Sequence, residues 1–350
     1  MSGDFTELKT LLGRLADGHT LSADEARDGF EIMMSGNATP SQMGAFLMAL
    51  RVRGETVDEI TGAASAMRAK ATKIKAPDNA IDTVGTGGDA IGSHNISTAT
   101  ALVVAGCGVP VAKHGNRAFS SKSGAADVLM ALGVNVDCDF ALIERAIREA
   151  GVGFMMAPRF HSAMRHVAGT RVEIGTRTIF NILGPLSNPA GVKRLLVGCF
   201  ARKWIAPMAR TLANLGAVHA WVVHGGDGLD EISTTGPTYV AECKGGQLRE
   251  FEVKPEDAGL PRAKLDDLKG GTPQENAEAI RALVVGKPGP FRDIVALNAG
   301  AALIVAGKAA SIADGVKLAA ASIDGGKAKA ALDRLVAITN APPPATAQGD

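Results

Sequence analysis

The sequence predicts an α/β protein with two parts: a small N-terminal helical domain, and a large domain in which helices flank a mostly parallel central sheet. Two observations carry this prediction. Residues 1–75 contain three capping boxes that each open a helical pattern, whereas from Ala80 onward short β-rich runs alternate with helical stretches. The chain of 350 residues also exceeds the usual size of a single domain.

The capping boxes predict three helices near the N-terminus. They are Ser22-x-x-Glu25, Thr39-x-x-Gln42 and Thr56-x-x-Glu59. After Thr39, apolar residues recur at intervals of three and four positions as far as Leu50, and Gly54 ends the helix. We therefore expect residues 1–75 to form a helical bundle domain, completed by a later helical segment near residues 160–190.

The β-rich runs predict the strands of one sheet. The strand candidates are residues 81–84, 109–112, 153–157, 194–200 and 219–223. Helical stretches separate them, so the strands should run parallel. Two short runs within residues 237–253, joined by Gly245-Gly246, predict a β-hairpin. We expect residues 76–340 to form this α/β domain and the proline-rich residues 341–350 to be a disordered tail.

A glycine-rich loop follows the first strand candidate. It reads Gly85-Thr86-Gly87-Gly88-Asp89, and Ser97 and Thr98 then open an apolar helix. Glycines let backbone N–H groups approach a phosphate, and the N-terminus of a helix favours an anion. The spacing matches neither G-x-G-x-x-G nor the P-loop. Taken alone, the loop is typical either of a phosphate site or of a tight strand-to-helix turn.

Two further clusters follow other strand candidates. Residues 113–117, Lys-His-Gly-Asn-Arg, are expected to form a loop that supplies cations for phosphate, next to the serines of residues 120–123. Residues 225–233 contain the adjacent carboxylates Asp230 and Glu231, a pair typical of Mg²⁺ sites that bind phosphates. Either cluster alone would also fit a solvated turn. Three such loops at the carboxyl ends of strands predict one shared site, because open α/β sheets bind ligands at that edge.

With these motifs in this order, the chain resembles the anthranilate phosphoribosyltransferase family. The motifs are G-T-G-G-D, N-I-S-T, K-H-G-N-R, S-S-K-S-G, R-T-I-F-N-I-L-G-P-L and D-G-L-D-E, and the resemblance spans roughly residues 5–335. It implies a nucleoside phosphorylase/phosphoribosyltransferase-like fold. The implied reaction transfers the phosphoribosyl group of phosphoribosyl pyrophosphate (PRPP) to the amine of anthranilate, giving N-(5-phosphoribosyl)anthranilate and pyrophosphate. This is the second step of tryptophan synthesis from chorismate, and the resemblance also implies Mg²⁺ and a homodimer. The N-terminus has no apolar core of the signal-peptide type and no apolar run is long enough for a membrane span, so we expect a cytoplasmic protein.

The same resemblance implies site residues. PRPP would be bound by Gly85, Gly88, Asp89, Ser93, Asn95, Ile96, Ser97, Thr98, Lys113, His114, Gly115, Asn116, Arg117, Ala118, Phe119, Ser120, Ser121 and Ala125. Mg²⁺ would be contacted by Ser97, Asp230 and Glu231, and anthranilate by Gly85, Asn116 and Arg171. Catalysis would rest on Lys113, Asn116 and Arg171. The one small departure is Ser93, where the family commonly has threonine; the hydroxyl is kept.

Chemistry separates the candidate residues further. Arginines at 159, 165, 171 and 177 recur every six positions, which is not one helical face, so we expect most to be solvated. Arg171 is the exception, since its planar fork suits the carboxylate of anthranilate. The amine of anthranilate is neutral at pH 7, so we expect His114 to position groups rather than act as a general base. Mg²⁺, Lys113 and backbone amides would stabilise the leaving pyrophosphate.

Composition disfavours other classes of protein. A net charge of +1, with one Tyr and two Trp, argues against a nucleic-acid-coating protein. No apolar run approaches the ~20 residues of a membrane span, and the four widely spaced cysteines predict free thiols. One alternative is a pyrimidine nucleoside phosphorylase-like enzyme, although Asp82-Thr83-Val84 replaces the lysine and histidine expected before its glycines. The other is a non-enzymatic, nucleic-acid-binding relative, which the intact carboxylates and near-neutral charge disfavour.

Overall fold

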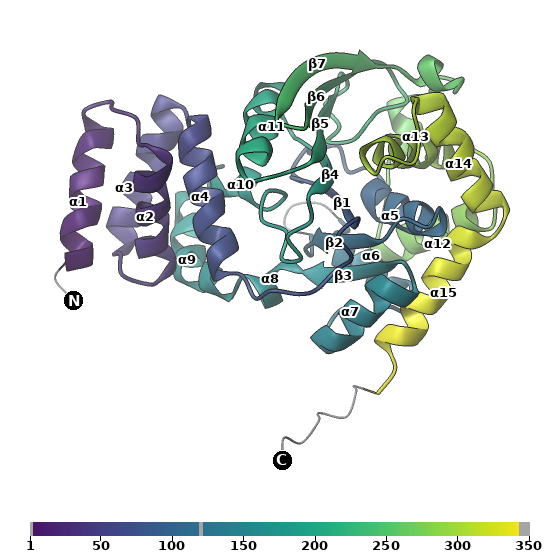
Figure 1. The fold of residues 1–350 in the computed structure, drawn as a ribbon, viewed down its shortest axis with the longest axis horizontal. Coiled ribbons are helices and arrows are strands. Elements are labelled where there is room, and N and C mark those ends of the chain that lie inside the picture. The colour runs from purple at the N-terminus through teal and green to yellow at the C-terminus, as the bar shows by residue number, and fades with distance from the viewer. Residues whose placement is uncertain (1–2, 119–121, 343–350) are drawn as a thin grey trace.

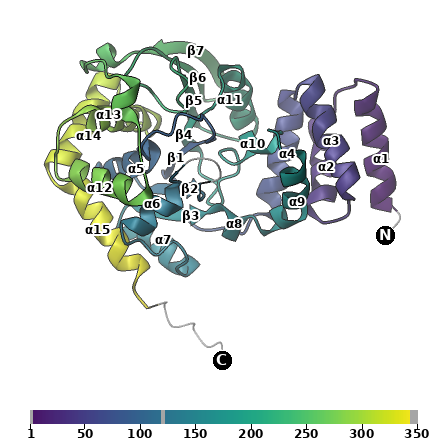
Figure 2. The same ribbon diagram turned by 180° about the vertical axis from the view of Figure 1, so that it is seen from behind.

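The computed structural model describes residues 3–118 and 122–342, which form a helical lobe beside an α/β lobe (Figure 1). In the helical lobe, α9 packs against α2 and α3, although about a hundred residues of the other lobe separate it from them in the chain. The helices of this lobe are α1 (Gly3–Ala16), α2 (Ala23–Met34), α3 (Pro40–Arg53), α4 (Val57–Lys70) and α9 (Arg165–Ile174). The view from behind shows the same grouping (Figure 2).

The three predicted capping boxes are confirmed and begin α2, α3 and α4. In each box the Ser or Thr hydroxyl accepts a hydrogen bond from the backbone three residues on, and the Glu or Gln side chain accepts one in return. Gly54 ends α3 with a φ of 95°, a conformation that favours glycine. The predicted apolar stripe of α3 is buried: Met43, Phe46, Leu47 and Leu50.

The α/β lobe is built on one seven-stranded sheet with the order β3-β2-β1-β4-β5-β6-β7. The pairings among β1 to β5 are parallel, and β6 and β7 add the predicted hairpin as an antiparallel edge. The strands are β1 (Ile81–Gly85), β2 (Val111–Gly115), β3 (Val152–Met156), β4 (Arg194–Gly198), β5 (His219–Gly225), β6 (Thr238–Lys244) and β7 (Gln247–Val253). The predicted fold class is therefore confirmed.

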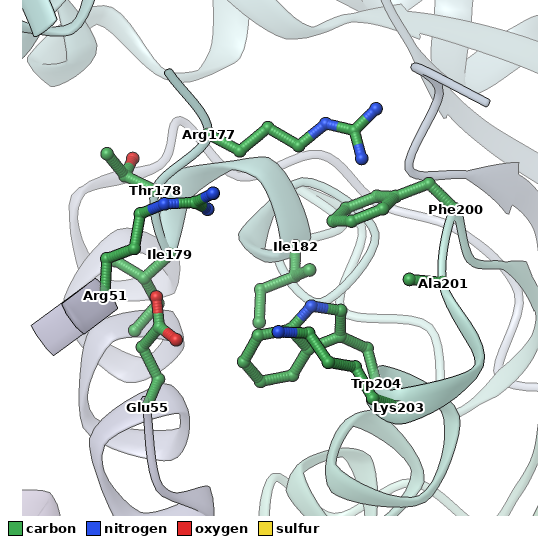
Figure 3. A pocket seen from close by; sticks show the side chains of 10 residues that line it. All are labelled: Arg51, Glu55, Arg177, Thr178, Ile179, Ile182, Phe200, Ala201, Lys203 and Trp204. Carbon is green, nitrogen blue, oxygen red and sulfur yellow. The ribbon is translucent and has the colours of Figure 1, made fainter. Parts of the chain in front are cut away.

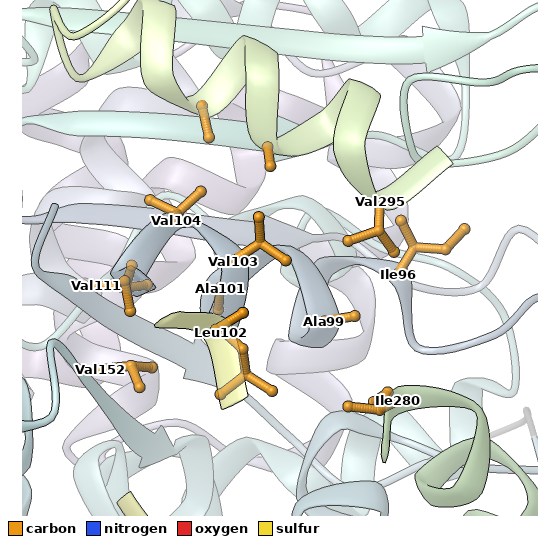
Figure 4. Packing of buried hydrophobic residues seen from close by; sticks show 14 of the residues in the cluster. Ile96, Ala99, Ala101, Leu102, Val103, Val104, Val111, Val152, Ile280 and Val295 are labelled. Atoms are coloured by element: carbon orange, nitrogen blue, oxygen red, sulfur yellow. The ribbon is translucent and has the colours of Figure 1, made fainter. Parts of the chain in front are cut away.

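Apolar side chains cover both faces of the sheet. Along β4, Leu196 belongs to the core beneath α5 and α13, whereas Leu195 and Val197 belong to the core shared with α4 and α11. Figure 4 shows α5 embedded in the first of these cores. The remaining α-helices are α5 (Ile96–Gly106), α6 (Ala125–Ala131), α7 (Phe140–Glu149), α8 (Ala157–Phe160), α10 (Phe180–Leu183), α11 (Ile205–Asn214), α12 (Pro273–Val284), α13 (Pro290–Val305), α14 (Ile312–Asp324) and α15 (Lys327–Thr339). Short 3₁₀ turns are η1 (Ser162–Met164), η2 (Arg202–Trp204), η3 (Pro255–Ala258) and η4 (Leu265–Leu268).

One predicted loop is corrected by the structure. Lys113, His114 and Gly115 are the last residues of β2, not the start of a loop. Their polar groups are tolerated in a buried strand because β1 supplies partners: the Asp82 carboxylate accepts a hydrogen bond from the His114 N–H at 3.2 Å. The loop begins at Asn116.

Three sequence predictions remain: the domain boundaries, the C-terminal tail and the lack of a membrane-spanning helix. The domain boundaries near residues 75 and 340 stay a prediction, and residues 343–350 of the expected tail lie outside the described residues. Across residues 3–118 and 122–342, none of the helices is both long and apolar enough to span a bilayer.

Candidate active site

The candidate site lies where the strand order reverses, between β1 and β4. These two strands end together, with Gly85 directly opposite Gly198. A Cβ on Gly85 would lie 2.5 Å from the Asp230 carboxylate, and one on Gly198 would lie 1.6 Å from the Asp230 carbonyl oxygen. Both glycines therefore allow the loop after β5 to lie directly on the ends of β1 and β4. Such a switch point is where open α/β sheets bind ligands.

The glycine-rich loop after β1 is held by this neighbouring loop. Gly87 and Gly88 have φ of 67° and 76°, the left-handed region that favours glycine. The Gly87 N–H donates a hydrogen bond of 2.8 Å to the Asp230 carboxylate, and the Asp89 carboxylate accepts one of 3.2 Å from the Ile91 N–H. The first and third predicted loops therefore meet at one place.

Three carboxylates gather here and repel one another. Burial, followed by the charge of Asp89, raises the pKa of Asp230 to about 7. Burial and the charge of Asp230 raise the pKa of Glu231 well above its usual range, and burial raises that of Asp89. The Glu231 carboxylate accepts a hydrogen bond of 3.1 Å from the Ser97 N–H at the N-terminus of α5. The described residues contain no set of three or more His, Cys, Asp or Glu side chains already arranged around one metal position.

Lys113 is the buried cation facing these carboxylates. It is 2% exposed, and its ammonium group donates to the Thr83 carbonyl at 2.6 Å and to the Ser97 hydroxyl at 3.3 Å. Burial lowers the pKa of Lys113, while the attraction of Asp82 and of the two loop carboxylates opposes that shift. Burial likewise raises the pKa of Asp82, to about 6. The site thus holds more potential negative than positive charge.

Asn95 joins the first loop to the second. Its amide nitrogen donates to the Ser123 carbonyl at 3.1 Å, and its amide oxygen accepts from the Ser123 hydroxyl at 3.0 Å and from Asn276 at 2.9 Å. Ser93 forms an isolated bridge with Lys269. Asn276 is 1% exposed and had no signal in the sequence, because its partner lies 181 positions away.

The loop after β2 is only partly described. The Asn116 side chain accepts a hydrogen bond from the Arg117 N–H at 2.8 Å, and the Asp127 carboxylate accepts one from the Ala118 N–H at 2.9 Å. The Arg117 guanidinium lies 4.0 Å from Asp127. Ala125 is the first residue of α6. The predicted site residues Phe119, Ser120 and Ser121 lie outside the described residues.

The other predicted site residues have different surroundings. Ile96 and Thr98 are each 1% exposed. Arg171 lies in the last turn of α9, in the other lobe, with its guanidinium 5.2 Å from the centre of the Phe180 ring. Burial lowers its pKa. Among the described residues, the Arg171 guanidinium has neither a hydrogen bond nor an ion pair, so it has no carboxylate partner and is not joined to Gly85 or Asn116.

A pair of buried histidines was not recognised from the sequence. The rings of His114 and His161 have centres 5.1 Å apart. Nδ1 of His114 lies 3.2 Å from the Gly184 carbonyl, whereas Nε2 of His114 and both nitrogens of His161 lack a hydrogen bond of normal geometry among the described residues. Burial lowers the pKa values to about 3 and about 4, so both rings are neutral at pH 7. His114 lies in β2 and His161 follows α8, so no local sequence pattern could show that the two rings meet.

A cavity of about 220 Å³ lies between the lobes (Figure 3). It is lined by Arg51 of α3 and Glu55 just after that helix, by residues 177–179 and Ile182, and by residues of the segment 200–204 after β4. None of the described residues of the three predicted loops lines it. Two of its lining residues contact the glycine-rich loop: Arg177 donates a hydrogen bond to the Gly88 carbonyl, and the Phe200 N–H donates one to the Thr86 hydroxyl.

Comparison with protein families defines the class of protein. Residues 9–71 match a model of the helical bundle domain of a glycosyl transferase family, and residues 77–329 match the model of its α/β domain. The chain is thus a two-domain glycosyl transferase of that class. It is 63% identical to the anthranilate phosphoribosyltransferase of Paramagnetospirillum magneticum, over 95% of this chain and 96% of that protein. It is 61% identical to that of Rhodopseudomonas palustris, over 96% of this chain and 99% of the relative.

Solved structures of anthranilate phosphoribosyltransferases also resemble this chain in fold. The anthranilate phosphoribosyltransferase of Thermus thermophilus superposes with a TM-score of 0.90 at 45% identity, covering 94% of this chain and 99% of that one. The Saccharomyces cerevisiae enzyme, in complex with PRPP and Mg, superposes with a TM-score of 0.86 at 27% identity, covering 95% and 97%. The chain belongs to the anthranilate phosphoribosyltransferase family, as its motifs predicted. The pyrimidine nucleoside phosphorylase-like alternative receives no support from these relatives.

Proposed function

We propose that this chain transfers the phosphoribosyl group of PRPP to the amine of anthranilate, releasing pyrophosphate and forming N-(5-phosphoribosyl)anthranilate for tryptophan synthesis. The observation that carries the proposal is the meeting of the glycine-rich loop, the N-terminus of α5 and Lys113 with the carboxylates after β5. Backbone donors, an ammonium group and oxygen ligands at one switch point suit a metal-bound polyphosphate.

Ser97, Asp230 and Glu231 are the residues that would hold Mg²⁺. All three present oxygen, the donor that Mg²⁺ prefers, and Mg²⁺ commonly takes one or two carboxylates and completes its shell with phosphates and water. The absence of a ready-made metal centre among the described residues agrees with a metal that arrives together with the polyphosphate. When bound, Mg²⁺ would neutralise negative charge on the leaving pyrophosphate.

The reaction breaks the bond between C1 of the ribose and pyrophosphate and forms a bond from C1 to the amine nitrogen, which then loses one proton. Negative charge grows on the leaving group, and Lys113 and the N–H groups of the glycine-rich loop are the fixed donors that would stabilise it. Arg171, whose guanidinium is unpaired among the described residues, would bind the acceptor carboxylate, and Asn116 would be a further polar contact. His114 and His161, both neutral, can orient the acceptor through hydrogen bonds but are poor proton acceptors at their lowered pKa values.

The test is loss of anthranilate fluorescence by purified protein with PRPP and Mg²⁺, with and without a chelator. We expect consumption that requires both PRPP and Mg²⁺. Arg171→Ala should raise the KM for anthranilate by about tenfold or more, whereas Arg165→Ala, an exposed arginine of the same helix, should leave it unchanged. Asp230→Ala should remove the metal-dependent rate. Turnover of a pyrimidine nucleoside with phosphate, and none of anthranilate, would instead favour the phosphorylase.

The proposal extends to a homodimer that works in the cytoplasm. Val52 on α3 and Val172 on α9 are 80% and 69% exposed, and these two helices pack side by side, which supports a subunit contact there. All four cysteines are free thiols, as expected in a reducing compartment. Three of them are buried, and Cys107 is half-buried. Analytical ultracentrifugation tests the dimer: Val172→Glu should give monomers, and Leu318→Glu on α14 should not.

A further inference from the structure

Arg177 lies in the short linker between the lobes. Helix α9 ends at Gly175, whose φ of 62° turns the chain, and the Thr178 N–H donates to the Asn181 side chain at 3.0 Å at the entry to α10. The Arg177 side chain extends from this linker towards the α/β lobe, over the ring of Phe200 (Figure 3). Although it is exposed, as the sequence predicted, it is not simply solvated.

Two contacts hold the guanidinium group in place. One of its N–H groups donates a hydrogen bond to the carbonyl oxygen of Gly88, in the glycine-rich loop. Its carbon atom lies 4.1 Å from the centre of the Phe200 ring, within the range of a cation–π contact. Phe200 is tied to the same loop, since its N–H donates to the Thr86 hydroxyl at 3.0 Å. Thr86 is in turn anchored to β4 by a hydrogen bond of 2.9 Å from its N–H to the Gly198 carbonyl.

The contact with Gly88 fixes the direction of a neighbouring amide. The described residues contain no cis peptide, and in a trans peptide the C=O and the following N–H point in opposite directions. While the Gly88 carbonyl points to Arg177, the Asp89 N–H must therefore point away from it. Two peptide groups earlier, between Thr86 and Gly87, the Gly87 N–H is held by the Asp230 carboxylate. Two peptide groups of the loop are thus oriented by neighbouring segments, one by the carboxylate loop and one by the linker.

We propose that Arg177 is a positioning residue for the polyphosphate of PRPP: by bonding the Gly88 carbonyl while stacked on Phe200, it holds the glycine-rich loop in its phosphate-binding shape. The inference rests on the proposed function and extends it to a residue outside the three loops. A guanidinium is suited to this role because it can donate in its plane while its face stacks on a ring. A lysine could supply the hydrogen bond but not the stacking, so it should replace the arginine only in part.

The test compares wild type with Arg177→Met, Arg177→Lys and the exposed control Arg165→Ala, with separate KM values for PRPP and anthranilate. We expect Arg177→Met to raise the KM for PRPP at least tenfold, to change the KM for anthranilate less than twofold at saturating PRPP, and to leave the thermal midpoint within about 2 °C of wild type. Arg177→Lys should recover part of the loss. A KM for PRPP within twofold of wild type, or equal rises of both KM values with a lowered thermal midpoint, would overturn the proposal.

A second measurement separates this inference from the proposed function. If wild type shows no transferase activity, the proposed function fails, and Arg177 is then tested by calorimetric titration with pyrophosphate and Mg²⁺. Binding at least tenfold weaker in Arg177→Met than in wild type would support the positioning role. Equal binding in both proteins, or no binding by wild type, would overturn it.

Discussion

Gly198→Ala is a one-methyl change that should move the carboxylate loop. A Cβ at this position would lie 1.6 Å from the carbonyl oxygen and 2.6 Å from the carbonyl carbon of Asp230, whereas Cβ contacts under 3.0 Å essentially do not occur. The backbone at Asp230 must therefore retreat by at least about 1.4 Å. The φ of Gly198 is not in the left-handed region, so alanine fits the backbone and the effect is purely steric.

A displacement of this size should abolish most activity. It would break the 2.8 Å hydrogen bond from Gly87 to the Asp230 carboxylate and carry that carboxylate away from its position. Misplacing a reacting or binding group by about 1 Å can cost a factor of about 100 in rate, and overpacking costs about 1–3 kcal/mol of stability. We expect kcat to fall about 100-fold and the Mg²⁺ concentration for half-maximal rate to rise. The assay is anthranilate consumption at varied Mg²⁺, with circular dichroism to check the fold.

Gly236→Ala is the matched control. It also lies in the carboxyl-edge loops, but a Cβ there meets no atom within 4 Å and its φ is not in the left-handed region. It should behave as wild type. Should Gly198→Ala keep kcat and its Mg²⁺ requirement within twofold of wild type, the close approach of the two loops does not matter for activity and the steric reasoning is wrong.

Three further predictions concern stability. Glu59→Ala leaves two backbone N–H groups and an arginine without their buried acceptor, so urea unfolding should show a loss of about 3–5 kcal/mol. Gly315→Ala would place a Cβ 2.5 Å from a carbonyl oxygen of α13 and should lower the thermal midpoint. His161, facing His114 and Lys73, has its pKa lowered from 6.5 to about 4, chiefly by burial. Between pH 6.5 and pH 4 the imidazole of His161 is protonated in the unfolded state but neutral in the folded state. The free energy of unfolding should therefore fall, as the pH is lowered through this range, by up to about 1.4 kcal/mol per pH unit. His161→Asn should flatten that slope; an unchanged slope contradicts the assignment.

The sequence predicted those parts of the fold whose signals are local. A capping box is complete within four residues, so the starts of α2, α3 and α4 could be read directly. The alternation of β-rich and helical runs likewise predicted the parallel strands and the hairpin around Gly245-Gly246. The expectation that three loops meet followed from a rule of parallel sheets, and it holds for the loops after β1 and β5.

What the sequence could not provide depends on partners far away in the chain. The end of β2 was misplaced because Lys113 and His114 are typical of a loop until Asp82 and Thr83 are known to receive their polar groups. Nothing in the sequence indicated that position 198 must be glycine. The reason is the backbone of Asp230, about thirty residues later, which leaves no room for a Cβ there. Arg177 resembled its solvated neighbours in the six-residue series for the same reason. Such roles are properties of the packed structure rather than of local pattern.

The charges of the site explain why the metal and the polyphosphate belong together. Asp82, Asp230 and Glu231 face one buried ammonium, Lys113, and Asp89 lies beside Asp230; burial raises the pKa values of all four carboxyl groups. A polyphosphate alone would add several negative charges to this group and be repelled. A divalent cation would neutralise part of that charge, since Mg²⁺ commonly takes one or two carboxylates and completes its shell with phosphate oxygens and water. In the proposed function the cation and the polyphosphate would each supply what the other lacks, and Lys113 and the glycine-rich loop would bind the phosphate oxygens that the metal does not.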